Sequence, residues 1–323
     1  MSIGIGTAVG ALLFAALVAM PAGTHRPTEL SLPAITTNSC GMGSLPDQPA
    51  YDPSDHYLYV PNQGSNNVTV VTPNCASVAS IALPSGSDPT SAVYDPSDNY
   101  VYVADTNLSC LYVLSGTTLK KTISSSLFDG PWDPIYDPGE AGLIVPDYSG
   151  HNVTFVQGTK VIGNYPVGIE PHAVAYDPYY ATLLVANEWT DNVTILSAIN
   201  LGHIADVPVG TNPGYIAYDP ADQLDYVVNL NGYNITLLTG TGAQAGSISL
   251  GTFATTVVFD QKNLDMYASC NQARYLQVIH GTSLVRTEIF VLPHADPIGE
   301  AFVDATNMMY VTDPYYDLLY IMP

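Results

Sequence analysis

The sequence predicts an all-β fold, a seven-bladed β-propeller with four-stranded blades, because one pattern recurs seven times in 323 residues. Each copy starts at an aromatic or apolar residue, and successive starts lie 40 to 44 residues apart. The starts are Tyr51, Tyr94, Tyr136, Tyr176, Tyr218, Phe259 and Val303. A period of this length is typical of one propeller blade. No stretch after residue 22 has a helical period of apolar residues, which also favours a fold made of strands.

Each copy predicts the same order of strands and turns. In five copies the starting aromatic residue is followed by Asp-Pro, and proline ends the first strand in a turn. A β-rich run such as residues 57–60 follows, then a polar loop, and then a run such as residues 193–196 in which Val alternates with Thr. A weaker run such as residues 160–162 is expected to form the outer strand before a Gly/Pro segment leads into the next copy.

The seventh copy contains only three of the four expected strands, the last of them at residues 318–322. Residues 28–37, with the sequence TELSLPAITT, precede the first copy and resemble an outer strand. We expect residues 28–37 to complete the seventh blade, because this closes the ring and leaves no open sheet edge.

The second strand of several copies carries a short motif, YVTD at residues 310–313, YVAD at residues 102–105 and LVAN at residues 184–187. These runs resemble the Tyr-Val-Thr-Asn motif of the YVTN family of β-propeller proteins, which is common on archaeal and bacterial cell surfaces. The resemblance covers about residues 28–323 and implies the fold and a surface location, but little about activity. Two cysteines depart from the pattern, Cys270 at the Asn position of the motif and Cys110 in the next strand of the second copy.

The N-terminal segment is apolar from residue 3 to residue 20 and carries no charge before His25. Residues 1–22 therefore predict either a secretory signal peptide or an N-terminal membrane anchor, followed by a linker at residues 23–27 and the propeller at residues 28–323. Both alternatives predict an extracellular or cell-surface protein, with membrane attachment in the second.

The charge balance excludes nucleic acid and anionic membrane surfaces as partners. Seven Lys and Arg residues oppose 29 Asp and Glu residues, which gives a formal net charge of −22. Polyanions would be repelled by such a chain. We expect a surface protein, a glycan or an envelope polymer as the partner.

Four cysteines in an exported chain predict up to two disulfides, with three alternative connectivities. The predicted strands place Cys40, Cys110 and Cys270 on one face of the propeller and Cys75 on the opposite face. We expect a long-range bridge on the first face, while buried thiols are the alternative. No CxxC motif is present, which excludes a zinc ribbon and a c-type haem site.

Five Asn-X-Ser/Thr sequons occur, and four of them begin 16 residues after the start of their copy. In an exported protein this pattern predicts N-glycosylation of an exposed loop. The alternative is that Asn-Val-Thr is only the loop-to-strand sequence of the repeat. The candidate sites are Asn67, Asn107, Asn152, Asn192 and Asn234.

Acidic and histidine side chains precede the first strand of several copies, where they would line the mouth of the central channel. Glu170-Pro-His172 brings a carboxylate and an imidazole close together, so Glu170 and His172 are the candidate acid/base pair. The candidate ligands for a divalent cation, the one cofactor that we consider, are Asp88, Asp129, His294, Asp296 and Glu300. The alternative is that these are solvated loop residues of an acidic protein.

No GxSxG, HExxH or GxxxxGK[ST] motif is present. Export, the sequons and the lack of a catalytic motif favour a non-enzymatic binding, adhesion or envelope-associated propeller. One alternative is a secreted lactonase-, lyase- or hydrolase-like enzyme that uses the channel mouth, as other seven-bladed propellers do. Another is a subunit of a surface lattice or filament, which would self-assemble through the apolar N-terminal segment.

Overall fold

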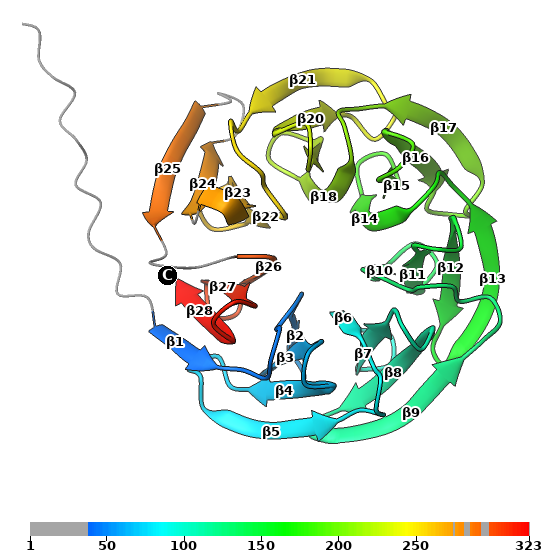
Figure 1. Ribbon diagram of the computed structural model, residues 1–323. Coiled ribbons are helices and arrows are strands. Elements are labelled where there is room, and N and C mark those ends of the chain that lie inside the picture. Colours follow the sequence, from blue (N-terminus) through cyan, green and yellow to red (C-terminus); the bar gives the residue numbers. More distant parts are fainter. Residues whose placement is uncertain (1–37, 274, 281–284, 292–296, 323) are drawn as a thin grey trace, which may run out of the picture. The chain divides into compact units, whose positions relative to one another are not determined.

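The computed structural model describes residues 38–273, 275–280, 285–291 and 297–322. Its contacts divide the chain into a unit of residues 1–34 and a unit of residues 35–323, and only the second falls within the described residues. That unit consists of seven four-stranded antiparallel sheets in a ring, so the predicted fold class is confirmed (Figure 1). The predicted leader or anchor at residues 1–22 and the linker lie outside the described residues.

Each blade is numbered in chain order, and its first strand is the innermost. Blade 1 has β2 (Ala50–Asp52), β3 (Tyr57–Asn62), β4 (Asn67–Val71) and β5 (Ser77–Ala82). Blade 2 has β6 (Pro89–Asp95), β7 (Tyr100–Asp105), β8 (Cys110–Ser115) and β9 (Thr118–Ser124). Blade 3 has β10 (Ile135–Asp137), β11 (Gly142–Asp147), β12 (Asn152–Gln157) and β13 (Lys160–Pro166). Blade 4 has β14 (Pro171–Asp177), β15 (Thr182–Asn187), β16 (Asn192–Ser197) and β17 (His203–Pro208).

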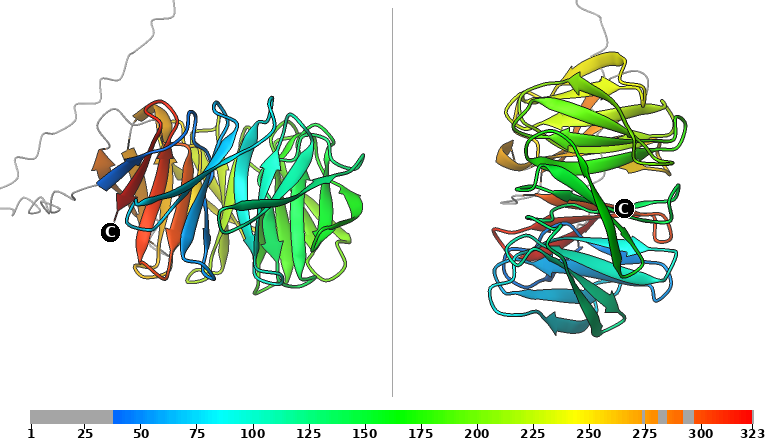
Figure 2. Two further views of the ribbon diagram at one scale, coloured as in Figure 1. Left: turned by 90° about the horizontal axis from the view of Figure 1, so that it is seen from below. Right: turned by 90° about the vertical axis from the view of Figure 1, so that its right-hand side faces the viewer.

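The remaining blades repeat this order. Blade 5 has β18 (Pro213–Asp219), β19 (Leu224–Asn229), β20 (Asn234–Leu238) and β21 (Gln244–Ser249). Blade 6 has β22 (Val257–Asp260), β23 (Asp265–Cys270), the 3-10 helix η1 (Asn271–Ala273), β24 (Tyr275–His280) and β25 (Val285–Val291). Blade 7 has β26 (Gly299–Val303), β27 (Met308–Asp313), β28 (Leu318–Met322) and β1 (Asn38–Gly41). The side views show the strands running between two faces, on which the connecting loops gather (Figure 2).

The ring closes through the N-terminal side of the chain, as the sequence predicts. Strand β1 pairs antiparallel with β28, with Asn38 opposite Ile321 and Gly41 opposite Leu318. The described strand begins directly after the predicted range of residues 28–37, which itself lies outside the described residues. The sequence NSCG of β1 has no apolar alternation that would have marked it as a strand.

The predicted disulfide on one face was wrong, because Cys40 is bonded to Cys75 with a Cα–Cα distance of 5.6 Å. Strand β1 is the outer strand of blade 7, and both cysteines pack against the apolar cluster between blades 7 and 1. An outer strand can therefore reach the β4–β5 turn of the next blade. Cys110 and Cys270 are buried thiols inside blades 2 and 6 and take no part in this bridge.

The Asp-Pro pair that ends the first strand of blades 1 to 5 has a direct structural role. In blade 1 the Asp52 carboxylate accepts a hydrogen bond from the Ser54 N–H at 2.7 Å, and in blade 4 Asp177 accepts one from the Tyr179 N–H at 2.8 Å. Aspartate therefore forms the turn from within, while proline ends the strand. Apolar residues of neighbouring sheets pack into seven buried clusters between and within blades. Within the described part of the chain, no helix has the length and apolar character needed to cross a membrane.

Candidate functional site

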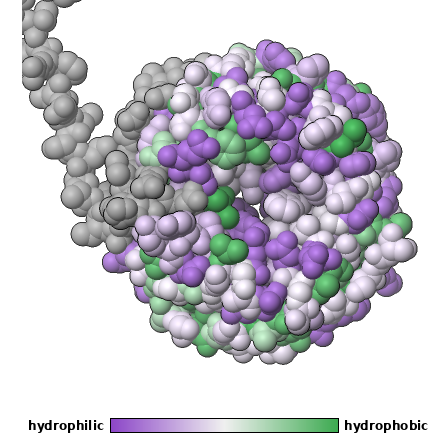
Figure 3. All heavy atoms as spheres, in the orientation of Figure 1, coloured by the Kyte–Doolittle hydropathy of each residue, from purple (hydrophilic) through white to green (hydrophobic). Residues whose placement is uncertain are grey.

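The segments that enter the seven first strands converge on the channel, which opens at the centre of the ring (Figure 3). One position of the repeat, four residues before the start of each copy, is occupied by five different residue types around the ring. We call these residues the channel ring: Asp47, Thr90, Trp132, His172, Gly214, Thr255 and Gly299.

Residues of six blades enclose a cavity of about 240 Å³ at this level of the channel. Four channel-ring residues line it together with side chains from their neighbours: Asp47, Gln63, Trp132, His172, Tyr215, Leu230, Phe253, Thr255 and Ile298. The lining is mostly apolar or aromatic with a few converging polar groups, which is the usual composition of a small-molecule site. We call this cavity the channel pocket.

Three aromatic rings form one wall of the channel pocket. The ring centroid of His172 lies 5.0 Å from that of Trp132 and 4.9 Å from that of Tyr215. Tyr148 extends the wall outward, with its ring 5.7 Å from Trp132 and edge-on to His172 at 6.1 Å. This packing holds the imidazole in one orientation.

His172 is a neutral base at neutral pH. Its side chain is only 8% exposed, and its Nδ1 atom has no hydrogen-bond partner among the described residues. Burial lowers the pKa of His172 to about 4, and a backbone contact with Gly214 partly opposes this shift. A neutral imidazole in the lining of a pocket can accept a proton from a ligand.

Asp47 has the opposite property and is a proton donor at neutral pH. It is 5% exposed, and its Oδ2 accepts a hydrogen bond from the Gln63 Nε2 at 2.6 Å. Burial raises the pKa of Asp47 to about 8, and the charges of Asp133 and Asp88 add to the shift. Asp133 is less affected: burial raises its pKa to about 6, while a hydrogen bond from the Ser91 hydroxyl at 2.7 Å opposes the rise.

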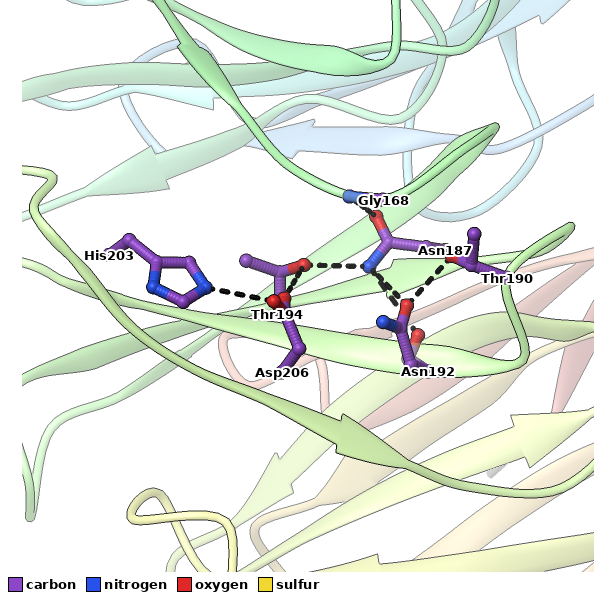
Figure 4. Close-up of polar contacts among 7 residues, drawn as sticks. All are labelled: Gly168, Asn187, Thr190, Asn192, Thr194, His203 and Asp206. Atoms are coloured by element: carbon purple, nitrogen blue, oxygen red, sulfur yellow. Dashed lines mark hydrogen bonds and ion pairs between the residues drawn. The ribbon is translucent and has the colours of Figure 1, made fainter.

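The loop that carries His172 is anchored by Asn187, the last residue of the LVAN run (Figure 4). The Asn187 Oδ1 accepts a hydrogen bond from the Gly168 N–H at 3.0 Å. Its Nδ2 donates to the Thr194 Oγ1 at 2.9 Å and to the Asn192 Oδ1 at 3.0 Å. The asparagine of the motif therefore ties the loop before β14 to the β15–β16 turn and so holds the segment that leads to His172.

The predicted partner of His172, Glu170, contacts Tyr148. The Tyr148 hydroxyl lies within hydrogen-bonding distance of the Glu170 Oε2 at 3.0 Å and of the Glu188 Oε2 at 3.1 Å. The Glu170 N–H donates to the His151 Nδ1 at 3.2 Å. Glu170 is thus connected to His172 through the Tyr148 ring, at the rim of the pocket.

Three of the predicted cation ligands, Asp88, Asp129 and Glu300, lie among the described residues. Among the residues that it describes, no group of three or more His, Cys, Asp or Glu side chains could hold a metal ion. The backbone N–H groups of Asp88 and Asp129 are bound by Asp105 and Asp147 of their own blades. The Glu300 carboxylate accepts a hydrogen bond from Ser269, and burial raises its pKa to about 8. His294 and Asp296 lie outside the described residues.

The sequon asparagines participate in the loop structure of the repeat. Asn192 accepts the hydrogen bond from Asn187. The Asn67 Nδ2 donates to the Ser80 hydroxyl at 2.6 Å, and the Asn107 Nδ2 donates to the Gly86 carbonyl at 2.7 Å. In the same way, Asn152 donates to the Gly150 carbonyl at 2.8 Å and Asn234 to the Ser247 hydroxyl at 3.3 Å. These contacts give the asparagines a structural role, and glycosylation stays a prediction.

Sequence reasoning selected His172 but missed Asp47 as its counterpart. The available signal was the repeat itself, because Asp47 and His172 each lie four residues before the start of their copy. Aligning the copies at that position, instead of searching for acids near histidines, would have joined the two residues.

Solved structures with this architecture are similar to the chain over most of its length. Selenomethionine-substituted virginiamycin B lyase from Staphylococcus aureus has a TM-score of 0.78 at 12% identity and covers 90% of this chain and 99% of its own. A streptogramin B lyase has a TM-score of 0.77 at 13% identity, covering 88% and 96%. A catalytically inactive histidine-to-alanine variant of the Staphylococcus aureus enzyme with quinupristin has a TM-score of 0.78 at 11% identity, covering 90% and 99%.

No protein-family model and no curated protein sequence matches the chain. The similar structures confirm the propeller fold, and at these identities the likeness extends to the fold alone. They are nevertheless enzymes, and this finding overturns our hypothesis of a non-enzymatic binding or adhesion propeller in favour of the enzyme alternative. The chemistry of this chain must therefore be inferred from the residues of its own channel pocket.

Proposed function

We propose that the chain is an enzyme of the lyase type, with His172 as the proton acceptor and Asp47 as the proton donor. The observation that carries the proposal is that both side chains line one buried pocket while their pKa values are displaced in opposite directions, to about 4 and about 8. Two titratable groups with separated pKa values are the usual basis of acid–base catalysis. The similar lyase structures support this reaction class.

In the proposed elimination, the neutral imidazole of His172 accepts a proton from the carbon beside a substrate carbonyl. The electron pair of that C–H bond forms a carbon–carbon double bond to the next carbon, and the bond from that next carbon to an ester or lactone oxygen breaks. Asp47 donates its proton to the leaving oxygen. The imidazolium then returns its proton to the Asp47 carboxylate, so the reaction consumes no water and no oxidant.

The pocket is suited to a side group of the substrate near the reacting bond. A cavity of about 240 Å³ cannot hold the whole of a large substrate, so the remainder would lie on the face around the mouth. There the Trp189 side chain is exposed (69% for the residue), and the Trp189 backbone N–H donates to the Ile169 carbonyl of the loop that carries His172. Such an exposed indole offers apolar contact area beside the pocket.

Quinupristin, the compound in one of the similar structures, is the first probe. Mass spectrometry separates the reaction classes, because hydrolysis adds the mass of one water molecule to the opened substrate and elimination adds none. We expect conversion without added water, reduced at least ~100-fold in His172→Ala and in Asp47→Asn. His203→Ala, on the outer strand β17, is the matched control and should retain activity. A wild-type protein that leaves quinupristin unchanged, or a His172→Ala variant that converts it normally, would refute the proposal.

We further infer that the protein works outside the cytoplasm and is a divergent YVTN-type propeller. The disulfide between Cys40 and Cys75 is typical of an oxidising compartment and supports export through residues 1–22. The LVAN, YVAD and YVTD runs support the family. Intact mass of the protein from its native host tests export and sequon glycosylation together, since an uncleaved, unmodified chain with reduced cysteines would contradict both.

A further inference from the structure

The channel pocket combines a wall of three aromatic rings with further apolar side chains. Trp132, His172 and Tyr215 form the first, and their centroid distances of 4.9 and 5.0 Å show that the rings are in contact. Leu230, Phe253 and Ile298 contribute to the rest of the lining. The volume of about 240 Å³ exceeds the roughly 150 Å³ of an engineered apolar cavity that binds benzene. It therefore has room for one aromatic ring and a carbonyl group attached to it.

The groups that face this cavity are uncharged at neutral pH. Burial keeps Asp47 protonated and His172 neutral, because it raises the pKa of the first and lowers the pKa of the second. Burial raises the pKa of Tyr215 well above its usual value, and the carboxylates of Asp47 and Asp133 add to the shift once they are ionised. The Tyr215 hydroxyl therefore keeps its proton. Gln63 carries no charge. Asp133 and Asp88, the other acids that act on Asp47, are not among the lining residues, and Asp133 is hydrogen-bonded to Ser91.

We propose that the channel pocket selects an uncharged aromatic group that bears a carbonyl, as in an aromatic ester, lactone or amide, and rejects charged groups of the same shape. The ring would pack against Trp132 and Tyr215 in offset or edge-on geometry. The Asp47 carboxyl group would donate to the carbonyl oxygen, and the neutral His172 imidazole would accept from a neighbouring donor. A charged group would leave water without gaining a partner of opposite charge, which is costly.

This inference rests on the proposed function, because it names the substrate class of the same site. It is tested by binding alone, so the two can fail separately. Binding of the neutral probe without turnover of quinupristin would leave the specificity in place and remove the reaction. Turnover of quinupristin without selective binding of the neutral probe would leave the reaction in place and remove the specificity.

Benzamide, benzoate and benzamidine provide three probes of nearly equal shape that are neutral, negative and positive. Since the chain has two tryptophans, Trp189→Phe leaves Trp132 in the pocket as the single fluorescent indole. The matched variant Trp132→Phe leaves only the exposed Trp189. At neutral pH we expect benzamide to change the Trp132 signal and to bind at least ~10-fold more tightly than either charged probe. The Trp132→Phe variant should show no saturable change.

The same titrations at about pH 9.5, above the Asp47 pKa of about 8, give a second outcome. Ionised Asp47 should now favour benzamidine, while Asp47→Asn should keep the preference for benzamide at both pH values. The inference is overturned if a charged probe binds as tightly as benzamide at neutral pH. It is equally overturned if no probe saturates the Trp132 signal, or if Asp47→Asn also changes its preference at high pH.

Discussion

Replacing Asn187 by alanine should separate the positioning of the His172 loop from the stability of the blade. The side chain is fully buried and makes three hydrogen bonds of 2.9 to 3.0 Å, one to the Gly168 N–H and two from Nδ2 to the β15–β16 region. At about 0.5–1.5 kcal/mol for each bond, the loss amounts to roughly 2–4 kcal/mol of unfolding free energy. Urea unfolding of wild type and variant measures this quantity directly.

Asn229→Ala is the matched control. Asn229 occupies the same repeat position in blade 5 and donates to the Thr236 Oγ1 at 3.0 Å and to the Asn234 Oδ1 at 2.9 Å. Its Oδ1, in contrast, has no hydrogen-bond partner among the described residues, so it does not hold a loop. Both variants should therefore lose stability, but only Asn187→Ala should increase hydrogen exchange at the Gly168 amide and lower kcat, by about tenfold for ~1.4 kcal/mol.

Asn187→Asp should restore the loop, because the carboxylate keeps the acceptor that the Gly168 N–H requires. Blade 3 has this arrangement naturally, with Asp147 accepting from the Asp129 N–H at 3.2 Å and from the Thr154 hydroxyl. Equal effects of Asn187→Ala and Asn229→Ala on Gly168 exchange and on kcat would refute the reasoning. So would an aspartate variant that exchanges as fast as the alanine variant.

Three further predictions follow from ionisation and ring closure. The pH dependence of kcat/KM should be bell-shaped, with limbs near the His172 pKa of about 4 and the Asp47 pKa of about 8. A pH–rate series of Asp47→Asn should lack the upper limb. An unchanged upper limb in this variant would exclude Asp47 as the donor. Burial and the Asp177 charge raise the pKa of Asp225 to about 8. The contribution of Asp225 to the free energy of unfolding is therefore complete below the pKa that its carboxyl group has in the unfolded chain, and it is lost as the pH rises toward 8. Urea unfolding should accordingly show higher stability at about pH 5 than at about pH 8, with a smaller difference in Asp225→Asn; an equal difference in that variant would contradict the assignment. Cys40→Ser removes a bridge across 35 residues and should cost up to about 4 kcal/mol, as should reduction of the wild type, whereas unchanged melting would show that the bridge does not stabilise the ring.

The repeat made the fold predictable, because a constant spacing of turns and alternating apolar residues defines a blade without any long-range information. Ring closure was predictable in principle, but the identity of the closing strand was not. Strand β1 has the short polar sequence NSCG, and only its pairing with β28 marks it. The prediction of the disulfide failed for the same reason, since the contact between Cys40 and the β4–β5 turn depends on how the first and last blades meet.

The lining of the channel pocket was predictable in part. His172 was a candidate because an acid and an imidazole lie close in sequence. In the structure, the Tyr148 hydroxyl contacts the Glu170 carboxylate, and the imidazole packs against Trp132 and Tyr215. Asp47 lies 125 positions before His172 in the numbering of the sequence, and only their shared position in the repeat connects the two. Their proximity in one pocket results from ring closure, and their pKa shifts from burial, neither of which a single sequence displays.

The protonation states of His172 and Asp47 test the account most directly, because they require no substrate. An NMR titration of the imidazole nitrogens and side-chain carboxyl carbons, assigned with His172→Ala and Asp47→Asn, measures both. The account predicts a neutral His172 that protonates only near pH 4 and an Asp47 that ionises near pH 8. Titration near the ordinary values of 6.5 and 3.8 would show two solvated groups and would contradict an acid–base pair in the channel.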